Sequence, residues 1–294
     1  MSFLTYFING LSLGSIYAII ALGYTMVYGI AKMLNFAHGD FIMVGCYVIF
    51  TIVATMGLPP VAGIVVAIIL CTLLGVTTEK VAYKPLRNAG SPLAVLITAI
   101  GVSYLLQNAA LLIFGADTKA FTPVITWQGI VIADGALKIQ GVTIITIVVS
   151  VLILVCLQTF INKTKAGQAM LAVAEDKGAA SLMGIDVNKT ISLTFAIGSA
   201  LAAIVGALMC SAYPSLTPYT GAMPGIKAFV AAVLGGIGSI PGAMIGGLIL
   251  GIIEILGKTY VSSQLSDAIV FGILVVVLLV KPTGILGKNI QEKV

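Results

Sequence analysis

The sequence predicts an all-α protein, a polytopic transmembrane helical bundle, and three observations carry that prediction. Of its 294 residues, 60% are hydrophobic and only 9% are charged, whereas soluble domains contain roughly 25% charged residues. Uncharged apolar runs such as 61–76, 143–157 and 269–280 indicate helices that cross a bilayer, which takes ~20 residues. These runs are apolar on every side, whereas strands of a membrane barrel alternate apolar and polar residues. We therefore expect one transmembrane domain, 1–294, with about seven to nine membrane segments.

The expected spans follow from the apolar runs, taken in chain order. We expect membrane helices near 7–30, 41–57, 60–78, 93–115, 141–161, 191–213 and 265–281. The remaining apolar stretch, 226–257, has 32 residues and is too short for two ordinary spans. We expect it to be a broken or re-entrant segment, in which two short half-helices meet at the sequence GGIGSIPG of Gly235–Gly242. A break at membrane depth needs partners for its backbone polar groups, so protein or a watery cavity should lie beside it.

Glycines recur at the small-xxx-small spacing that lets membrane helices approach closely. The pairs are Gly10/Gly14, Gly238/Gly242, Gly242/Gly246 and Gly247/Gly251. The density of glycine over 235–251 favours a packed or broken segment there, although glycine is also simply tolerated in membrane helices.

Lysine and arginine residues concentrate in three regions outside the expected spans. These regions are 79–90, 162–190 and the tail from Lys281, with Lys80, Lys84, Arg87, Lys163, Lys165, Lys177, Lys189, Lys288 and Lys293. By the positive-inside rule they face the cytoplasm. Counting spans back from the tail then places the C-terminus in the cytoplasm and the N-terminus outside.

The connection 116–140 should lie on the external side. It contains three short β-like runs, Val124–Trp127, Ile130–Ile132 and Leu137–Ile139, around turns rich in Gly and Asp. We interpret it as an external hairpin, with a disordered loop as the alternative.

Polar residues within the apolar chain mark the candidate pathway and gate. Between the first two spans lies Asn-Phe-Ala-His-Gly-Asp, in which Asn35, His38 and Asp40 are candidates because ionisable groups inside membranes are usually functional. The alternative is that Asn35 and Asp40 are cap residues that close one helix and open the next. In the glycine-rich break the candidates are Gly235, Gly236, Gly238, Pro241 and Gly242.

Glu254 is a further pathway candidate, because it lies in the apolar run 241–257. We expect it near the outer interface beside Lys258, one helical turn on; a buried partner for a polar helix face is the alternative. Lys227 is expected to be an interfacial lysine whose amine reaches water.

The cytoplasmic loop 162–190 is organised rather than random. Its stretch Ala169–Met183 is rich in helix formers, and Gly184 should end the helix. Leu171, Ala174, Ala179, Leu182 and Met183 are expected to share one apolar face. Such an amphipathic helix would lie on the membrane or dock a soluble partner.

Catalysis and metal binding are not predicted for this chain. It has one histidine, no nucleophile motif with a base, and four cysteines without metal-ligand spacing. We expect a transport subunit rather than an enzyme, with no metal site.

Three blocks of sequence resemble one known family. They are GLSLGSIYAIIALGYTMVYGIAKMLNFAHGDFIMVG (10–45), AVAEDKGAASLMGIDVNKTISLTFAIGSALA (172–202) and GIKAFVAAVLGGIGSIPGAMIGGLILGIIE (225–254). The chain resembles the permease subunits of branched-chain amino acid ABC importers of the LIV-H type. The resemblance implies a translocation pathway for leucine, isoleucine and valine, and extends over essentially the whole chain. Permeases for urea, amides or other amino acids, and an ion-coupled secondary transporter, are the alternatives.

The resemblance also implies a coupling helix that docks on the ATPase and carries the pattern EAA-x-x-x-G. The matching residues are Gly178, Ala179, Ala180, Ser181, Leu182, Met183 and Gly184. Gly178 stands where the pattern has glutamate, and Glu175 and Asp176 just upstream are candidates for the acidic face.

The implied partners are a paralogous second permease, two ABC ATPase subunits, a periplasmic substrate-binding protein and the lipid bilayer. The implied location is the bacterial inner membrane. ATP would bind to the partner ATPases, so this chain itself is expected to hold no cofactor and to bind no nucleic acid.

Overall fold

The computed structural model describes residues 2–87, 92–121, 123–132 and 137–287. Within these residues the α-helices are α1 (Ser2–Ala31), α2 (His38–Phe50), α3 (Pro60–Thr78), α4 (Pro92–Phe114), α5 (Gly141–Lys163), α6 (Lys165–Glu175), α7 (Lys177–Leu182), α8 (Val187–Ala212), α9 (Ala222–Gly235), α10 (Ile240–Tyr260) and α11 (Ser266–Val280). Two π-helical turns, Thr51–Thr55 and Glu79–Tyr83, extend α2 and α3, and a 3-10 turn follows at Lys84–Leu86. The polytopic helical bundle expected from the sequence is confirmed.

Seven of the described helices are long and apolar enough to cross a membrane, and two shorter apolar helices, α9 and α11, accompany them. This agrees with the expected seven to nine segments. The seven begin with α1 and include the extended α2 and α3, then α4, α5, α8 and α10.

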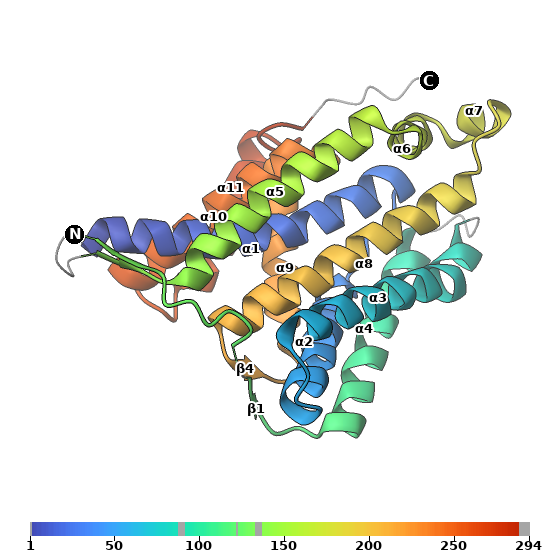
Figure 1. Cartoon of the computed structure of the whole chain (residues 1–294). Helices are drawn as coiled ribbons and strands as arrows, with labels where there is room; N and C mark the ends of the chain where they lie inside the picture. Colours follow the sequence, from blue (N-terminus) through green and yellow to red (C-terminus); the bar gives the residue numbers. More distant parts are fainter. Residues whose placement is uncertain (1, 88–91, 122, 133–136, 288–294) are drawn as a thin grey trace.

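Helix α1 is the centre of the bundle, and its middle residues 18–22 have no exposed surface. Figure 1 shows α1 between α5 and α8, with α10 alongside. Helices α1 and α10 run antiparallel, because Gly10 lies against Ile252 and Gly14 against Leu248. Side chains at these glycines would overlap the backbone of the facing helix, so the expected close packing at small residues is confirmed for this pair.

The broken segment lies where the sequence places it, but its two halves differ. Helix α9 has 14 residues and α10 has 21, and the break covers 236–239. The expectation of two short half-helices is therefore wrong for the second, which is long enough to span. The glycine spacing of α10 explains its length, because Gly247 and Gly251 let it follow α1 from Ala18 to Gly14.

Short strands lie in the two connections that follow α4 and α8. Strands β2 (Ile130–Ile132) and β3 (Leu137–Ile139) form the expected antiparallel hairpin. The third expected run, Val124–Trp127, is not a strand. Instead β1 (Lys119–Ala120) pairs with β4 (Ser215–Leu216), which follows α8 and joins the connections after α4 and α8.

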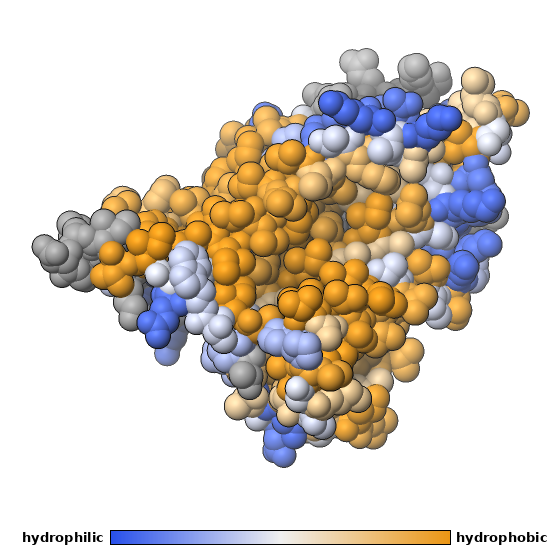
Figure 2. Space-filling model, viewed as in Figure 1, coloured by the Kyte–Doolittle hydropathy of each residue, from blue (hydrophilic) through white to orange (hydrophobic). Residues whose placement is uncertain are grey.

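The two ends of the bundle differ in charge. Most described basic residues lie where α1 ends and α6 and α7 begin, and Figure 2 shows hydrophilic residues gathered there beside a broad apolar surface. We call this the lysine-rich end; it includes Lys80, Lys84, Arg87, Lys163, Lys165, Lys177 and Lys189. Lys288 and Lys293 lie outside the described residues.

Candidate functional site

The turn between α1 and α2 returns the chain toward the interior of the bundle. Lys32 has a positive φ of 58°, which ends α1, and α2 begins only six residues later at His38. The ring of His38 lies 4.9 Å from that of Tyr24, centroid to centroid, and beside Gly23. Gly23 is about two turns before the end of α1. Helix α2 therefore starts beside the body of α1 and not level with its C-terminal end.

Asn35 lies on this turn and Asp40 lies in the first turn of α2, but neither is the N-cap of α2. The N-cap of α2 is Ala37, which makes no side-chain cap bond. Asn35 Oδ1 accepts a 2.8 Å hydrogen bond from the hydroxyl of Tyr83, and Asp40 Oδ1 accepts one of 2.9 Å from Gln107 Nε2. The capping alternative is therefore wrong, because neither residue is the N-cap of α2 and both buried side chains bind residues of other segments.

His38 is buried in this corner, with 1% of its surface exposed, and its Nε2 has no hydrogen-bond partner in the described structure. It packs on the rings of Tyr24 and Phe41. The structure thus places His38 in an aromatic setting, and its proposed role in gating stays a prediction.

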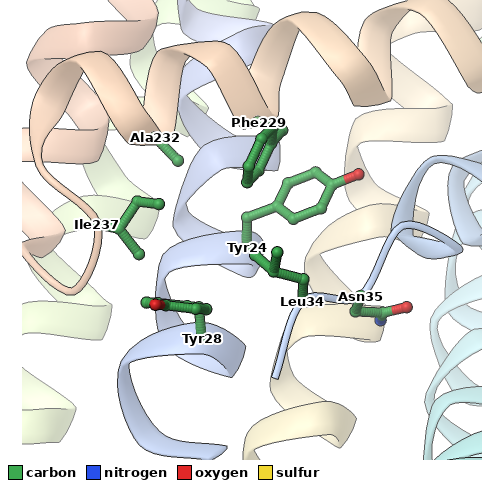
Figure 3. A pocket seen from close by; sticks show the side chains of 7 residues that line it. All are labelled: Tyr24, Tyr28, Leu34, Asn35, Phe229, Ala232 and Ile237. Atoms are coloured by element: carbon green, nitrogen blue, oxygen red, sulfur yellow. The ribbon is translucent and has the colours of Figure 1, made fainter. Parts of the chain in front are cut away.

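A small pocket joins the turn to the broken segment, two regions that were predicted separately. It is lined by Tyr24, Tyr28, Leu34, Asn35, Phe229, Ala232 and Ile237. Figure 3 shows Tyr24 and Phe229 close together, with Tyr28 and Ile237 facing each other at the opposite side. Three elements therefore meet at one site with three aromatic side chains: α1, the 32–37 turn and α9 with its following break.

The break at 236–239 is held by backbone partners from the tail of the chain. Gly236 and Gly238 have φ of 104° and 95°, in the left-handed region that favours glycine. The amides of Ile285 and Leu286 each donate a 2.9 Å hydrogen bond, to the carbonyls of Leu234 and Gly235 respectively. Protein, rather than water, satisfies the carbonyls at the end of α9.

The start of α10 completes this break. The side chain of Ser239 accepts a 3.2 Å hydrogen bond from the amide of Gly242, and Pro241 stands at the first turn, where it needs no amide partner. Gly242 lies against Gly235, where a side chain would overlap the carbonyl of Gly235. The candidates of the break thus form one close crossing of α9 and α10.

Glu254 lies in a partly buried group of charges away from the lysine-rich end. Its Oε1 is 2.7 Å from Lys227 Nζ and 2.6 Å from Lys258 Nζ, and its Oε2 accepts a 2.8 Å bond from the Tyr17 hydroxyl. Lys227 Nζ is also 2.7 Å from Asp267 Oδ1. The predicted pairing with Lys258 is present, and Glu254 is also buried, with 1% exposed.

Lys227 is not the interfacial lysine that the sequence suggested. It is 6% exposed and binds Glu254 and Asp267. Two lysines and two carboxylates balance in this group, and through Tyr17 they join α1, α9, α10 and α11. Sequence reasoning missed this because the partners Lys227 and Glu254 stand 27 positions apart.

The expected coupling region is two helices rather than one. Asp176 separates α6 from α7 and is the N-cap of α7, since its Oδ1 accepts from the amides of Gly178 at 2.7 Å and Ala179 at 2.9 Å. The single helix over Ala169–Met183 is therefore wrong, because the Asp176 side chain starts a new helix. Glu175, at the end of α6, is exposed. Gly184 ends α7 with a φ of 84°, as predicted.

The expected apolar face is divided between the two helices, because Leu171 and Ala174 lie on α6 whereas Ala179 and Leu182 lie on α7. Met170, Val173 and Ala180 are buried, whereas Leu182 and Met183 are 91% and 83% exposed. Leu182, at the end of α7, and Met183 thus point away from the bundle, whereas Ala180 faces it. Ala179 and Gly178, at its start, are exposed as well.

Lys177 ties this region to the centre of the bundle, a contact with no signal in the sequence. Its Nζ donates a 2.9 Å hydrogen bond to the carbonyl of Ala31, at the end of α1. Burial and the nearby charges of Arg87 and Lys32 lower the pKa of Lys177. The ammonium group of Lys177 interacts favourably with the negative, C-terminal end of the α1 dipole.

Comparison with known proteins gives a consistent family. The model for "Branched-chain amino acid transport system / permease component" matches residues 6–278. The LivH permease protein of the high-affinity branched-chain amino acid transport system from Salmonella typhimurium is 47% identical, over 99% of this chain and 98% of that protein. The BraD permease protein from Pseudomonas aeruginosa is 45% identical over the same shares.

A more distant relative covers most of the chain as well. The probable branched-chain amino acid transport permease protein LivH from Methanocaldococcus jannaschii is 31% identical, over 92% of this chain and 88% of that protein. Within the described residues no group of three or more His, Cys, Asp and Glu side chains is placed to hold a metal ion. The spanning helices, the family model and the full-length relatives agree, and the chain belongs to the branched-chain amino acid transport system permease family.

Proposed function

We propose that this chain is the LivH-type permease subunit of an ABC importer that carries leucine, isoleucine and valine across the bacterial inner membrane. The observation that carries the proposal is the full-length identity of 47% to a high-affinity LivH permease. The complex would add a paralogous second permease, two ATPase subunits that bind ATP, and a periplasmic binding protein. This chain would need no cofactor of its own.

The lysine-rich end would face the cytoplasm, with the C-terminus there and the N-terminus outside. The charge asymmetry of the bundle supports this orientation. The exposed α7, with Leu182 and Met183, would dock on an ATPase subunit at that end. The paired connections at the other end, with β1 and β4, would receive the binding protein.

Transport would proceed by alternating access, driven by closure of the ATPase dimer. Such coupling needs an element with two arrangements that both sites bias. The pocket where α1, the 32–37 turn and α9 meet supports this corner as that element, because Lys177 of α7 holds the end of the same α1 helix. Movement of α7 would thereby reach Tyr24 and Tyr28 through one continuous helix.

The test is ATP-driven uptake of labelled leucine in proteoliposomes that contain all the subunits. In the pair Leu182→Glu and Met183→Glu we expect loss of ATPase co-purification and of uptake, because two exposed apolar side chains become charged. Leu265→Glu is the matched control, since Leu265 is also exposed, at 53%, but lies between α10 and α11. It should keep the ATPase bound.

Three outcomes would change the proposal. Uptake that follows an ion gradient without any ATPase would replace it with a secondary transporter. ATPase binding without uptake of leucine would keep the importer and assign it a different solute. Full ATPase binding by the Leu182 and Met183 variants would move the docking surface away from α7.

A further inference from the structure

A second cavity lies on the side of the bundle, at the lysine-rich end. It has a volume of about 380 Å³ and is lined by Val76, Lys80, Lys84, Asn188, Lys189, Ser192, Leu193 and Ala196. One wall is the end of α3 with its π-helical turn, and the other is the first three turns of α8. The pathway and coupling residues described above contribute none of these side chains.

The polar half of the cavity is positively charged. Lys80 and Lys84 are exposed, and among the described residues no carboxylate pairs with either. Lys189 lies 3.3 Å from Asp186, but both side chains are largely in solvent, where such a pair contributes little. Three amines therefore line one opening, and a single exposed carboxylate offsets them.

The π-helical turn at Glu79–Tyr83 explains why the lysines face outward without acidic partners. Glu79 and Tyr83 are fully buried, whereas Lys80 and Lys84 are exposed. Glu79 is ion-paired with Arg87 and accepts a 2.5 Å bond from Ser192 Oγ. Arg87 in turn donates to Asn188 Oδ1. The carboxylate of Glu79 is thus already paired inside the wall, so it does not offset the charge of Lys80 or Lys84.

The other half of the cavity is apolar and lies within the spans. Val76 belongs to the last turn of the α-helical part of α3, and Leu193 and Ala196 lie about two turns inside α8. Above Val76 the exposed residues Val65, Ile69 and Leu73 follow at four-residue spacing. They form an apolar stripe along one face of α3 that leads to the two lysines.

We infer that this cavity binds an anionic phospholipid, with its phosphate among Lys80, Lys84 and Lys189 and an acyl chain along Val76 and Leu193. Basic pockets between membrane helices recognise anionic headgroups. Charge alone would also attract an acidic segment of a soluble protein. The apolar residues Val76, Leu193 and Ala196 favour a lipid, because they lie inside the spans, where hydrocarbon chains surround the protein. This inference needs only a chain in a bilayer and stands apart from the proposed substrate.

The test measures the affinity of the purified full-length chain, with the subunits that assemble with it, for phosphatidylglycerol by native mass spectrometry in detergent. In the double variant Lys80→Gln and Lys84→Gln we expect roughly 30-fold weaker binding, about fivefold for each lysine near a headgroup. Binding of phosphatidylcholine should not change. The matched control is Lys163→Gln with Lys165→Gln, two exposed lysines of the same end outside the cavity, and it should bind as the original does.

A second variant tests the apolar half without a change of charge. Ala196→Phe would fill the floor beneath the lysines, and we expect it to weaken phosphatidylglycerol binding by tenfold or more, which is about the loss of 1.4 kcal/mol. Size-exclusion profiles of both variants check that they fold.

Any of three results would overturn the inference. The first is equal loss of binding in the Lys163 and Lys165 control, which would show a diffuse surface charge. The second is unchanged binding in Ala196→Phe. The third is displacement of the lipid by inorganic phosphate at equal concentration, which would show a site for free anions.

Discussion

At the scale of single residues, Glu254 shows how a charge is kept inside a membrane protein. An ionised carboxylate is costly to bury unless it is paired and hydrogen-bonded. Glu254 has two lysines and a tyrosine hydroxyl as partners, and Lys227 is shared with Asp267. Each charge of the group is therefore compensated, and the loss of Glu254 or Lys227 leaves the other buried charge with fewer partners.

Replacement of Glu254 by leucine should destabilise the chain by about 3 kcal/mol, because it leaves buried Lys227 with one carboxylate instead of two. The measurement is the thermal unfolding of the purified protein in detergent. The double variant Glu254→Leu with Lys227→Met should recover part of the loss. Glu175→Leu, at an exposed glutamate, is the control and should have little effect. A melting temperature unchanged in Glu254→Leu would contradict the prediction.

The corner at 32–40 makes a related point about polar residues. Asn35 and Asp40 have the composition of helix caps, yet their side chains bind Tyr83 and Gln107. These partners come from other helices, 48 and 67 positions away. A helix cap is predicted from residues that are neighbours in the sequence. Such a prediction does not take account of long-range partners such as Tyr83 and Gln107.

At the scale of elements, the packing of α1 against α10 depends on glycine. Gly14 and Gly251 face each other so closely that a side chain on Gly251 would overlap the backbone of Gly14. Lipid supplies no hydrophobic drive between membrane helices, so close backbone contact is what holds such a pair. The small-xxx-small spacing in the sequence predicted this contact correctly.

Gly251→Ala should push α1 and α10 apart and destabilise the protein by about 1–3 kcal/mol, the usual cost of an overpacked core. Gly272→Ala is the matched control, because Gly272 is also helical, in α11, but has open space around it. Thermal unfolding of the two variants in the same detergent compares them. Similar melting temperatures for both would show that the α1–α10 contact yields to an added methyl group.

The breaks between elements were predictable in part. Gly236 and Gly238 in left-handed conformations end α9 where the sequence predicted a break. The Asp176 cap, which divides α6 from α7, was missed because alanine-rich sequence on both sides favours one helix. The tail from Lys281 was not expected to supply amides to Leu234 and Gly235, since no local pattern links segments so far apart in the chain.

At the scale of the whole molecule, the bundle is polar at its lysine-rich end and apolar along its sides (Figure 2). Such a distribution determines how the chain sits in the bilayer, because lysine and arginine are retained on the cytoplasmic side. Helix α7 and the basic cavity lie at the lysine-rich end of the molecule, whereas the β1–β4 pair lies beyond the C-terminal end of α8.

Cysteine labelling of intact cells tests this orientation. We expect Ser263→Cys, between α10 and α11, to react with a membrane-impermeant thiol reagent, and Ser181→Cys, on α7, to react only after permeabilisation. Both serines are exposed, and both variants are made in a chain from which the four native cysteines have been removed. The opposite labelling pattern would invert the orientation and place α7 outside.

Composition and local pattern were enough to predict that the chain lies in a bilayer, its helical class, the approximate ends of most spans and the position of its main break. These properties depend on composition and on patterns among neighbours, which a run of some twenty residues contains. The contact of Glu254 with Lys227, that of Asn35 with Tyr83, and the cavity that Lys80 and Lys84 share with α8 follow only from the packed helices. Side-chain partners of this kind come from helices whose relative rotation and depth are set by packing, and that packing is not encoded in any local pattern.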